Sequence, residues 1–216
     1  MGSSRSITVI VAVGCALLVG LQLAGQFAPA AVAKFIASSA FVALALRRGA
    51  LASLYGRLVL TGLALSWCGD LFLVGRTEAF FLAGLTAFLL AHVAYSAAFV
   101  GHGLGRVALA ATAVPIAVVA FFVWTWLEPQ TPAGLSLPVR AYIAVISLMV
   151  IFAFGTRGAG GSWLIPAGAS LFFLSDLSVA ALRLAGADYP TYVLGLPAYY
   201  AAQVCFALSV SQSRSH

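Results

Sequence analysis

Residues 105–127 read GRVALAATAVPIAVVAFFVWTWL, and no charged residue follows Arg106 in this run. About 20 consecutive apolar residues are enough for an α-helix to cross the hydrocarbon core of a bilayer. The apolar residues are continuous, whereas a strand of a membrane β-barrel alternates apolar and polar residues over about ten positions. The stretch therefore predicts a transmembrane helix.

Short breaks containing Gly, Pro or Arg divide the rest of the chain into seven further apolar segments, each wide enough to cross a membrane. The eight predicted spans are residues 7–26, 30–46, 57–74, 79–100, 105–127, 139–155, 164–184 and 191–210. We therefore expect an all-α fold. It would be one integral membrane domain, residues 1–216, built as a polytopic bundle of eight transmembrane helices.

The composition excludes several classes of protein. The 216-residue chain is 63% hydrophobic and 7% charged, whereas soluble domains carry about 25% charged residues. This excludes a water-soluble globule and a disordered chain. Eight spans take about 160 residues, which leaves no room for a separate soluble domain. The formal charge of +6 does not indicate nucleic-acid binding, because basic residues in a multi-pass chain set its orientation.

The basic residues predict that orientation. If the N-terminus is cytoplasmic, seven of the eleven Lys and Arg residues, Arg214 among them, lie in cytoplasmic segments. Lys34, Arg76, Arg140 and Arg183 then lie on the opposite side. Because cytoplasmic loops of membrane proteins are enriched in Lys and Arg, we expect both termini in the cytoplasm. In a bacterial cell the membrane would be the plasma membrane.

The spacing of charged residues predicts an internal repeat. Lys34 and Asp70 stand 36 residues apart, and so do Arg140 and Asp176. One shift of 106 residues therefore superposes a basic residue in an even-numbered span and an aspartate in the next span. We expect two parallel repeats of four helices, residues 1–104 and 105–210, with a site where the halves meet.

Ionisable residues inside the predicted spans are the candidates for function. A centred Asp, Lys or Arg costs about 2.5–3.5 kcal/mol even on lenient insertion scales, so such residues usually face a bundle interior and serve a function. Asp70 and Asp176 form a pair of intramembrane carboxylates, and two carboxylates in different environments can act as a protonated acid and an ionised base. The sequence lacks the motifs of serine and zinc hydrolases and of phosphate-binding loops. The usual parts of serine-hydrolase and zinc-hydrolase chemistry are therefore missing.

The residues alone leave three interpretations open. The carboxylates can serve an enzyme, a small proton-coupled or lipid-coupled transporter, or a structural bundle in which buried Asp–Lys and Asp–Arg pairs only hold helices together. His92 can be a catalytic residue or a core histidine bonded to Tyr95 or to a carbonyl group.

Glycine, polar and aromatic residues recur in a characteristic order from the second predicted span to the last: Lys34, Gly69-Asp70, Leu73, Phe81, Gly84, Phe88, His92, Tyr95, Gly168-Ala169, Leu171-Phe172, Ser175-Asp176 and Tyr199-Tyr200-Ala201-Ala202-Gln203. In this order and spacing the sequence resembles the YhhN family of membrane lysoplasmalogenases. One departure is Phe35, where the family pattern has a proline after the lysine.

The resemblance implies an ether hydrolase of lipid metabolism. Its substrate would be a lysophospholipid taken from the bilayer, and cleavage of the vinyl ether would release a fatty aldehyde and glycerophosphoethanolamine or glycerophosphocholine. Asp70 and Asp176 would be the acid and the base, in unspecified order, as in the two-carboxylate chemistry of glycoside cleavage. The resemblance implies no metal, no organic cofactor, no nucleic acid and no obligate protein partner.

Supporting roles follow from the same resemblance. His92 and Tyr95 would orient the water or a carboxylate. Tyr199 and Gln203 would hold the glycerol hydroxyl group. The lipid phosphate would meet Lys34 or Arg140.

Overall fold

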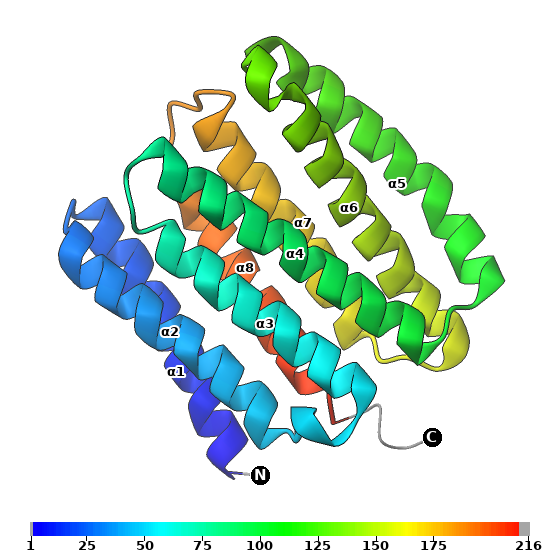
Figure 1. Ribbon diagram of the computed structural model, residues 1–216. Coiled ribbons are helices and arrows are strands. Elements are labelled where there is room, and N and C mark those ends of the chain that lie inside the picture. Colours follow the sequence, from blue (N-terminus) through cyan, green and yellow to red (C-terminus); the bar gives the residue numbers. More distant parts are fainter. Residues whose placement is uncertain (1, 212–216) are drawn as a thin grey trace.

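The computed structural model describes residues 2–211, and Arg214 lies outside the described residues. Eight long helices make up most of this part of the chain (Figure 1): α1 Gly2–Leu23, α2 Phe27–Arg47, α3 Leu54–Phe72, α4 Glu78–His102, α5 Arg106–Leu127, α6 Ser136–Gly155, α7 Leu164–Arg183 and α8 Tyr192–Ser209. Four short 3₁₀ helices lie in the connections: η1 Ala50–Ala52, η2 Glu128–Gln130, η3 Ala133–Leu135 and η4 Thr156–Ala159. The prediction of an all-α polytopic bundle is confirmed.

The helices identify a multi-pass integral membrane protein. Within the described residues, seven helices are long and apolar enough to cross a membrane. The eighth, α3, has 19 residues and contains Arg57 and Asp70, whose charges lower its mean hydropathy. It packs against α2, α4 and α8.

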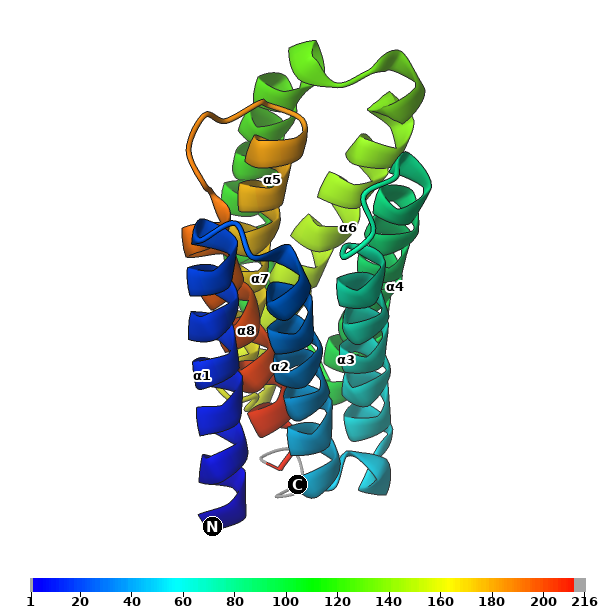
Figure 2. The ribbon, with the colours of Figure 1, turned by 90° about the vertical axis from the view of Figure 1, so that its left-hand side faces the viewer.

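Successive helices run in opposite directions, so the connections gather at two ends of the bundle. The first turn of α1 and the last turn of α8 lie at one end, which we call the terminal end (Figure 2). The connections at residues 24–26, 73–77, 128–135 and 184–191 lie at the opposite end, which we call the distal end.

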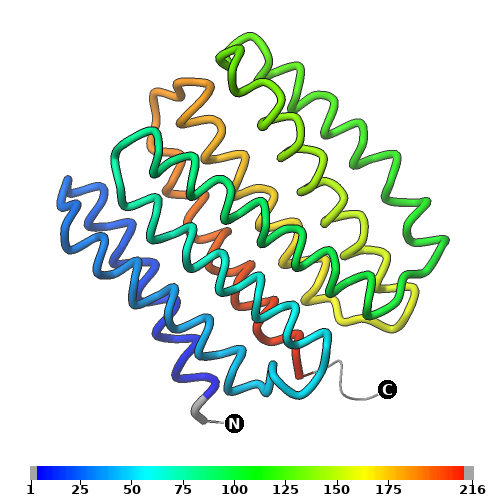
Figure 3. The backbone as a smooth tube through the Cα atoms, viewed as in Figure 1, coloured from blue at the N-terminus to red at the C-terminus, as the bar shows by residue number. Residues whose placement is uncertain are grey.

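The helices differ in how deeply they are enclosed. Helix α8 packs against α1, α2, α3 and α7, whereas the main helical partner of α5 is α6. The trace in Figure 3 shows α5 at one edge of the bundle and the α1–α2 pair at the other. Leu127 is the single buried residue of α5, so this helix presents an apolar surface to the surrounding lipid.

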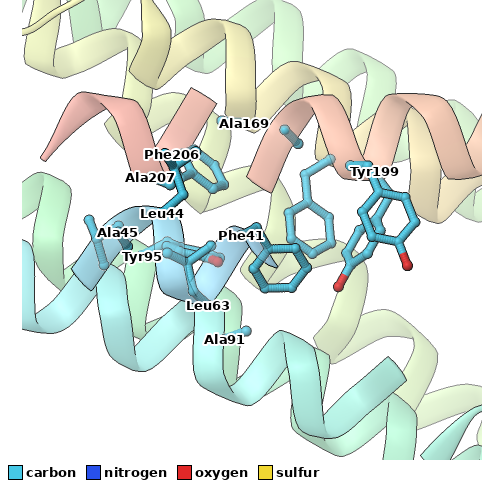
Figure 4. Close-up of a cluster of buried hydrophobic side chains, with 14 of the residues drawn as sticks. Phe41, Leu44, Ala45, Leu63, Ala91, Tyr95, Ala169, Tyr199, Phe206 and Ala207 are labelled. Carbon is cyan, nitrogen blue, oxygen red and sulfur yellow. The ribbon is translucent and has the colours of Figure 1, made fainter. Parts of the chain in front are cut away.

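Aromatic side chains fill the centre of the bundle. Tyr95 of α4 packs on Phe206 of α8, with ring centroids 4.4 Å apart, and Phe41 of α2 packs on Tyr199 at 6.1 Å (Figure 4). Tyr95 and Phe206 come late in α4 and α8, both of which start at the distal end. The aromatic cluster therefore lies toward the terminal end and forms a floor beneath the residues described next.

Candidate functional site

Asp70 lies in the last turn of α3, buried at 3% exposure. The ammonium of Lys34, on α2, is 3.4 Å from Oδ1 of Asp70. The hydroxyl groups of Ser38 and Tyr199 donate to Oδ2 at 2.6 and 2.7 Å. Two helices, α2 and α8, thus supply one cation and two hydroxyl donors to this carboxylate. Buried charges are tolerated when they are paired and hydrogen-bonded in this way.

Tyr200 extends the hydrogen bonds around Asp70. Its hydroxyl lies 3.1 Å from Oγ of Ser38 and donates to the carbonyl oxygen of Lys34 at 3.5 Å. Because the adjacent residues Tyr199 and Tyr200 reach toward Asp70 and Ser38, the middle of α8 is tied to α2 and α3.

Asp176 lies in α7 and has different neighbours. The hydroxyl of Tyr142, on α6, donates to Oδ2 of Asp176 at 2.8 Å. Nε2 of His92, on α4, lies 3.0 Å from the same oxygen and 3.1 Å from the Tyr142 hydroxyl. No lysine or arginine in the described part of the chain forms an ion pair with Asp176. Its side chain is 18% exposed.

His92 is fully enclosed, with 0% exposure. Its ring packs edge-on against Phe172 at 4.7 Å and Tyr142 at 5.3 Å between centroids. If Nε2 carries the proton, the ring donates to Asp176, and Nδ1 has no hydrogen-bond partner among residues 2–211. The histidine is placed to orient the carboxyl group of Asp176.

The two carboxylates line one cavity of about 240 Å³, together with Lys34, Tyr142 and Tyr199. The rest of the wall is mostly apolar and comes from both halves of the chain, with contributions that include Phe81, Leu85, Phe88, Leu127, Ile143, Ile146 and Phe173. An apolar cavity with a few convergent polar groups is the usual form of a small-molecule site. The described residues contain no group of three or more His, Cys, Asp or Glu side chains that could hold a metal ion.

Three of the residues predicted for the site lie elsewhere. The Tyr95 hydroxyl donates to Oε1 of Gln203 at 2.8 Å, and both residues are fully buried behind the cavity wall. Arg140 is exposed at the start of α6, where it donates to Glu128 at 3.1 Å and stacks on Trp124 at 4.3 Å. The sequence repeat paired Arg140 with Asp176, but Tyr142 takes that position.

Sequence reasoning missed three hydroxyl groups of the site. Ser38 follows Lys34 by four residues and therefore shares its helix face, a signal that could have identified it. Tyr200 adjoins the predicted Tyr199. No sequence pattern pointed to Tyr142. The repeat indicated Arg140, and Tyr142, two residues further on, is the residue that contacts Asp176.

Comparison with known proteins identifies the family. The sequence profile of the YhhN family matches residues 29–210. The protein named lysoplasmalogenase TMEM86A from Bos taurus is 29% identical over 167 residues, which are 72% of this chain and 66% of the relative. The Homo sapiens protein of that name is 31% identical over 162 residues, with the same coverage.

The chain thus spans slightly under two thirds of these curated relatives. No solved structure matches the chain. The family match covers most of the sequence and includes both carboxylates of the cavity. This protein belongs to the YhhN family.

Proposed function

We propose that this protein is a membrane hydrolase that cleaves the vinyl ether bond of lysoplasmalogens. The products would be a fatty aldehyde and glycerophosphoethanolamine or glycerophosphocholine. The main support is that Asp70 and Asp176 line one cavity with unlike hydrogen-bond partners. The names of the two curated relatives support the same substrate class.

The reaction needs one acid and one base. Protonation of the β-carbon of the vinyl ether gives an oxocarbenium ion, as in glycoside cleavage. A water molecule adds to the ion and loses a proton to the base, which gives a hemiacetal. The hemiacetal then breaks its bond to the glycerol oxygen. The sum is one vinyl ether and one water converted to one aldehyde and one alcohol.

Asp176 is the better candidate for the acid. Its described neighbours, Tyr142 and His92, both contact Oδ2, so Oδ1 is left for a ligand in the cavity. No lysine or arginine in the described residues pairs with it. No permanent cation therefore compensates the negative charge of an ionised Asp176, and it is the protonated form of a carboxyl group that can supply a proton to carbon.

Asp70 is the better candidate for the base, because the ammonium of Lys34 compensates the charge of its ionised form. Asp70 would take the proton of the attacking water and return it to the glycerol oxygen when the hemiacetal breaks down. Asp176, ionised after the first step, would recover a proton from the hemiacetal hydroxyl. Both carboxyl groups then end in their starting states, so the cycle closes with no external acid or base.

Purified protein in detergent should release aldehyde from a lysoplasmalogen, and Asp70→Asn and Asp176→Asn should each abolish release while the helical content and the elution volume stay those of the wild type. In water enriched in ¹⁸O, the label should be absent from the glycerol product, because the bond broken is on the vinyl side of the ether oxygen. Label in the glycerol product, or full activity of either variant, would contradict the mechanism.

The transporter hypothesis predicts that the protein cleaves no lipid. Protein reconstituted in vesicles would then couple proton flow to uptake of a solute or lipid and consume no lysoplasmalogen. Uptake without aldehyde release would replace the hydrolase proposal. In a purely structural bundle, substitution of either aspartate would unfold the protein without changing any activity.

A further inference from the structure

Arg183, the last residue of α7, lies at the cavity that holds the two carboxylates. Its guanidinium carbon is 5.6 Å from the centroid of the Phe81 ring, and Phe81 lines the same cavity. An arginine over an aromatic face is attracted by the ring and kept in place. A cation is thus held beside the cavity at the distal end of the bundle.

The other basic residues described at the distal end already have partners or lie elsewhere. Lys34 is paired with Asp70. Arg140 is paired with Glu128, and Arg76 stacks on Phe27 at 4.6 Å; neither Arg140 nor Arg76 lines the cavity. Arg183 lines it, and no carboxylate of the described residues forms an ion pair with Arg183.

The position of Arg183 along α7 suits a ligand that also reaches Asp176. Seven residues, or about two helical turns, separate Asp176 from Arg183, so the two side chains share one face of the helix with a rise of about 10 Å. In a lysoplasmalogen, the ether oxygen and the phosphorus are separated by three carbons and one oxygen of the glycerol backbone. This separation lets one lipid reach Asp176 with its vinyl ether and Arg183 with its phosphate.

We propose that Arg183 binds the phosphodiester of the lysolipid and sets the preference of the site for phosphorylated substrates; this inference rests on the proposed function. The planar guanidinium can donate two parallel hydrogen bonds to a phosphate, which a lysine cannot match. The earlier expectation assigned this contact to Lys34 or Arg140. The phosphate then lies near the membrane surface, and the alkenyl chain lies among the apolar residues of the cavity wall.

The test compares two substrates, one with and one without a phosphoethanolamine group. One is 1-O-alkenyl-glycero-3-phosphoethanolamine, and the other is 1-O-alkenylglycerol. Arg183→Gln should raise KM for the phosphorylated substrate about tenfold, as expected for loss of a charge-assisted hydrogen-bond pair. It should leave kcat/KM for the alkenylglycerol unchanged. Arg183→Lys should fall between wild type and Arg183→Gln.

Arg76→Gln is the matched control, because it removes a stacked arginine from the same end of the protein but outside the cavity. It should leave KM for both substrates unchanged. An Arg183→Gln variant that matches the wild type on both substrates, or that loses the same factor on both, would overturn the assignment.

A binding measurement tests the phosphate site independently of the proposed reaction. A saturated 1-O-alkyl-glycero-3-phosphoethanolamine has no vinyl ether, so its affinity is independent of turnover. Arg183→Gln should weaken its binding about tenfold and leave the binding of 1-O-alkylglycerol unchanged. If the wild type hydrolyses no lysoplasmalogen but this difference in binding holds, the proposed reaction fails and the phosphate site stands. Equal affinities of wild type and variant would reject the phosphate site.

Discussion

Lys34 and Asp70 bring opposite charges into a helix bundle that lies in lipid. Their side chains are 12% and 4% exposed. Each charge loses hydration on burial, and the loss is offset only while the partner and the surrounding hydroxyl donors stay in place. Removing one charge alone should therefore be worse than removing both.

Lys34→Met leaves the carboxylate of Asp70 without its cation and should lower the free energy of unfolding by about 3–5 kcal/mol, the usual effect of breaking a buried pair. The double variant with Asp70→Asn should regain most of that stability, because no charge remains. It should still release no aldehyde. Thermal unfolding in detergent measures the first effect. A Lys34→Met protein as stable as the wild type would show that the pair does not stabilise the bundle.

Substitution of Tyr142 tests how much its hydrogen bond to Asp176 contributes to catalysis. Tyr142→Phe removes the hydroxyl that donates to Oδ2 and keeps the ring against His92. Loss of one hydrogen bond of about 1 kcal/mol should lower kcat by roughly fivefold to tenfold with little change in KM. Tyr189→Phe, in an exposed connection, serves as the control and should have no effect. An equal loss in the two variants would argue against a role for Tyr142.

At the scale of the elements, helix α3 packs closely on α4 because two glycines face aromatic rings. A Cβ atom at Gly62 would lie 2.4 Å from a ring carbon of Tyr95, and one at Gly69 would lie 2.7 Å from a ring carbon of Phe88. Small residues allow membrane helices to approach each other in this way. The contact places Tyr95 within reach of Gln203 and brings Phe88 to the cavity wall.

Gly62→Ala should displace Tyr95 and weaken its hydrogen bond to Gln203, because the added Cβ overlaps the ring. Overpacking of a core costs about 1–3 kcal/mol, so the unfolding temperature should fall. Gly20→Ala in α1 is the control, because no heavy atom lies within 4 Å of an added Cβ there, and its unfolding temperature should match or exceed that of the wild type. Equal unfolding temperatures for Gly62→Ala and the wild type would mean that the α3–α4 contact adapts without loss.

At the scale of the whole molecule, the two ends of the bundle differ in charge. The terminal end carries six arginines in the described residues: Arg5, Arg47, Arg48, Arg57, Arg106 and Arg157. The distal end carries Arg76, Arg140 and Arg183, with Glu78, Glu128 and Asp188 as opposite charges. Lys34 also lies toward this end, where it is paired with Asp70. Basic residues favour the cytoplasmic side. We therefore expect the site to lie nearer the non-cytoplasmic face.

Cysteine labelling can test this orientation. In a variant lacking Cys15, Cys68 and Cys205, single cysteines can be placed at Leu51 and Tyr189, which are 62% and 63% exposed at opposite ends. A membrane-impermeant maleimide added to intact cells should label position 189 and spare position 51. Permeabilised cells should show label at both. Labelling of position 51 alone in intact cells would invert the topology.

The paired helices of the two predicted repeats lie in corresponding contacts. Helix α8 packs against α2, and α4 packs against α6, which is the arrangement that a twofold relation between residues 1–104 and 105–210 would produce. The repeat itself stays a prediction. The two halves differ in the residues around their carboxylates: Lys34 pairs with Asp70 in the first half, whereas Tyr142 contacts Asp176 in the second.

The number and approximate bounds of the helices followed from the sequence alone. The predicted spans 57–74 and 79–100 became α3, Leu54–Phe72, and α4, Glu78–His102. A short stretch of sequence is enough to predict such bounds, because the thickness of the bilayer sets the length of each apolar run. The sequence also singled out Asp70, Asp176, His92 and Lys34, since ionisable residues inside apolar spans stand out in composition.

The partners of each carboxylate depended on the tertiary structure. Helices in lipid are apolar on all sides, so hydrophobic periodicity does not show which face points inward. A shift of two residues, from Arg140 to Tyr142, turns a side chain by about 200° around the helix, which is the difference between the exposed pair with Glu128 and the contact with Asp176. Rotation and depth of each helix are decided by packing against its neighbours, and that packing also placed Tyr95 and Gln203 behind the cavity wall rather than in it.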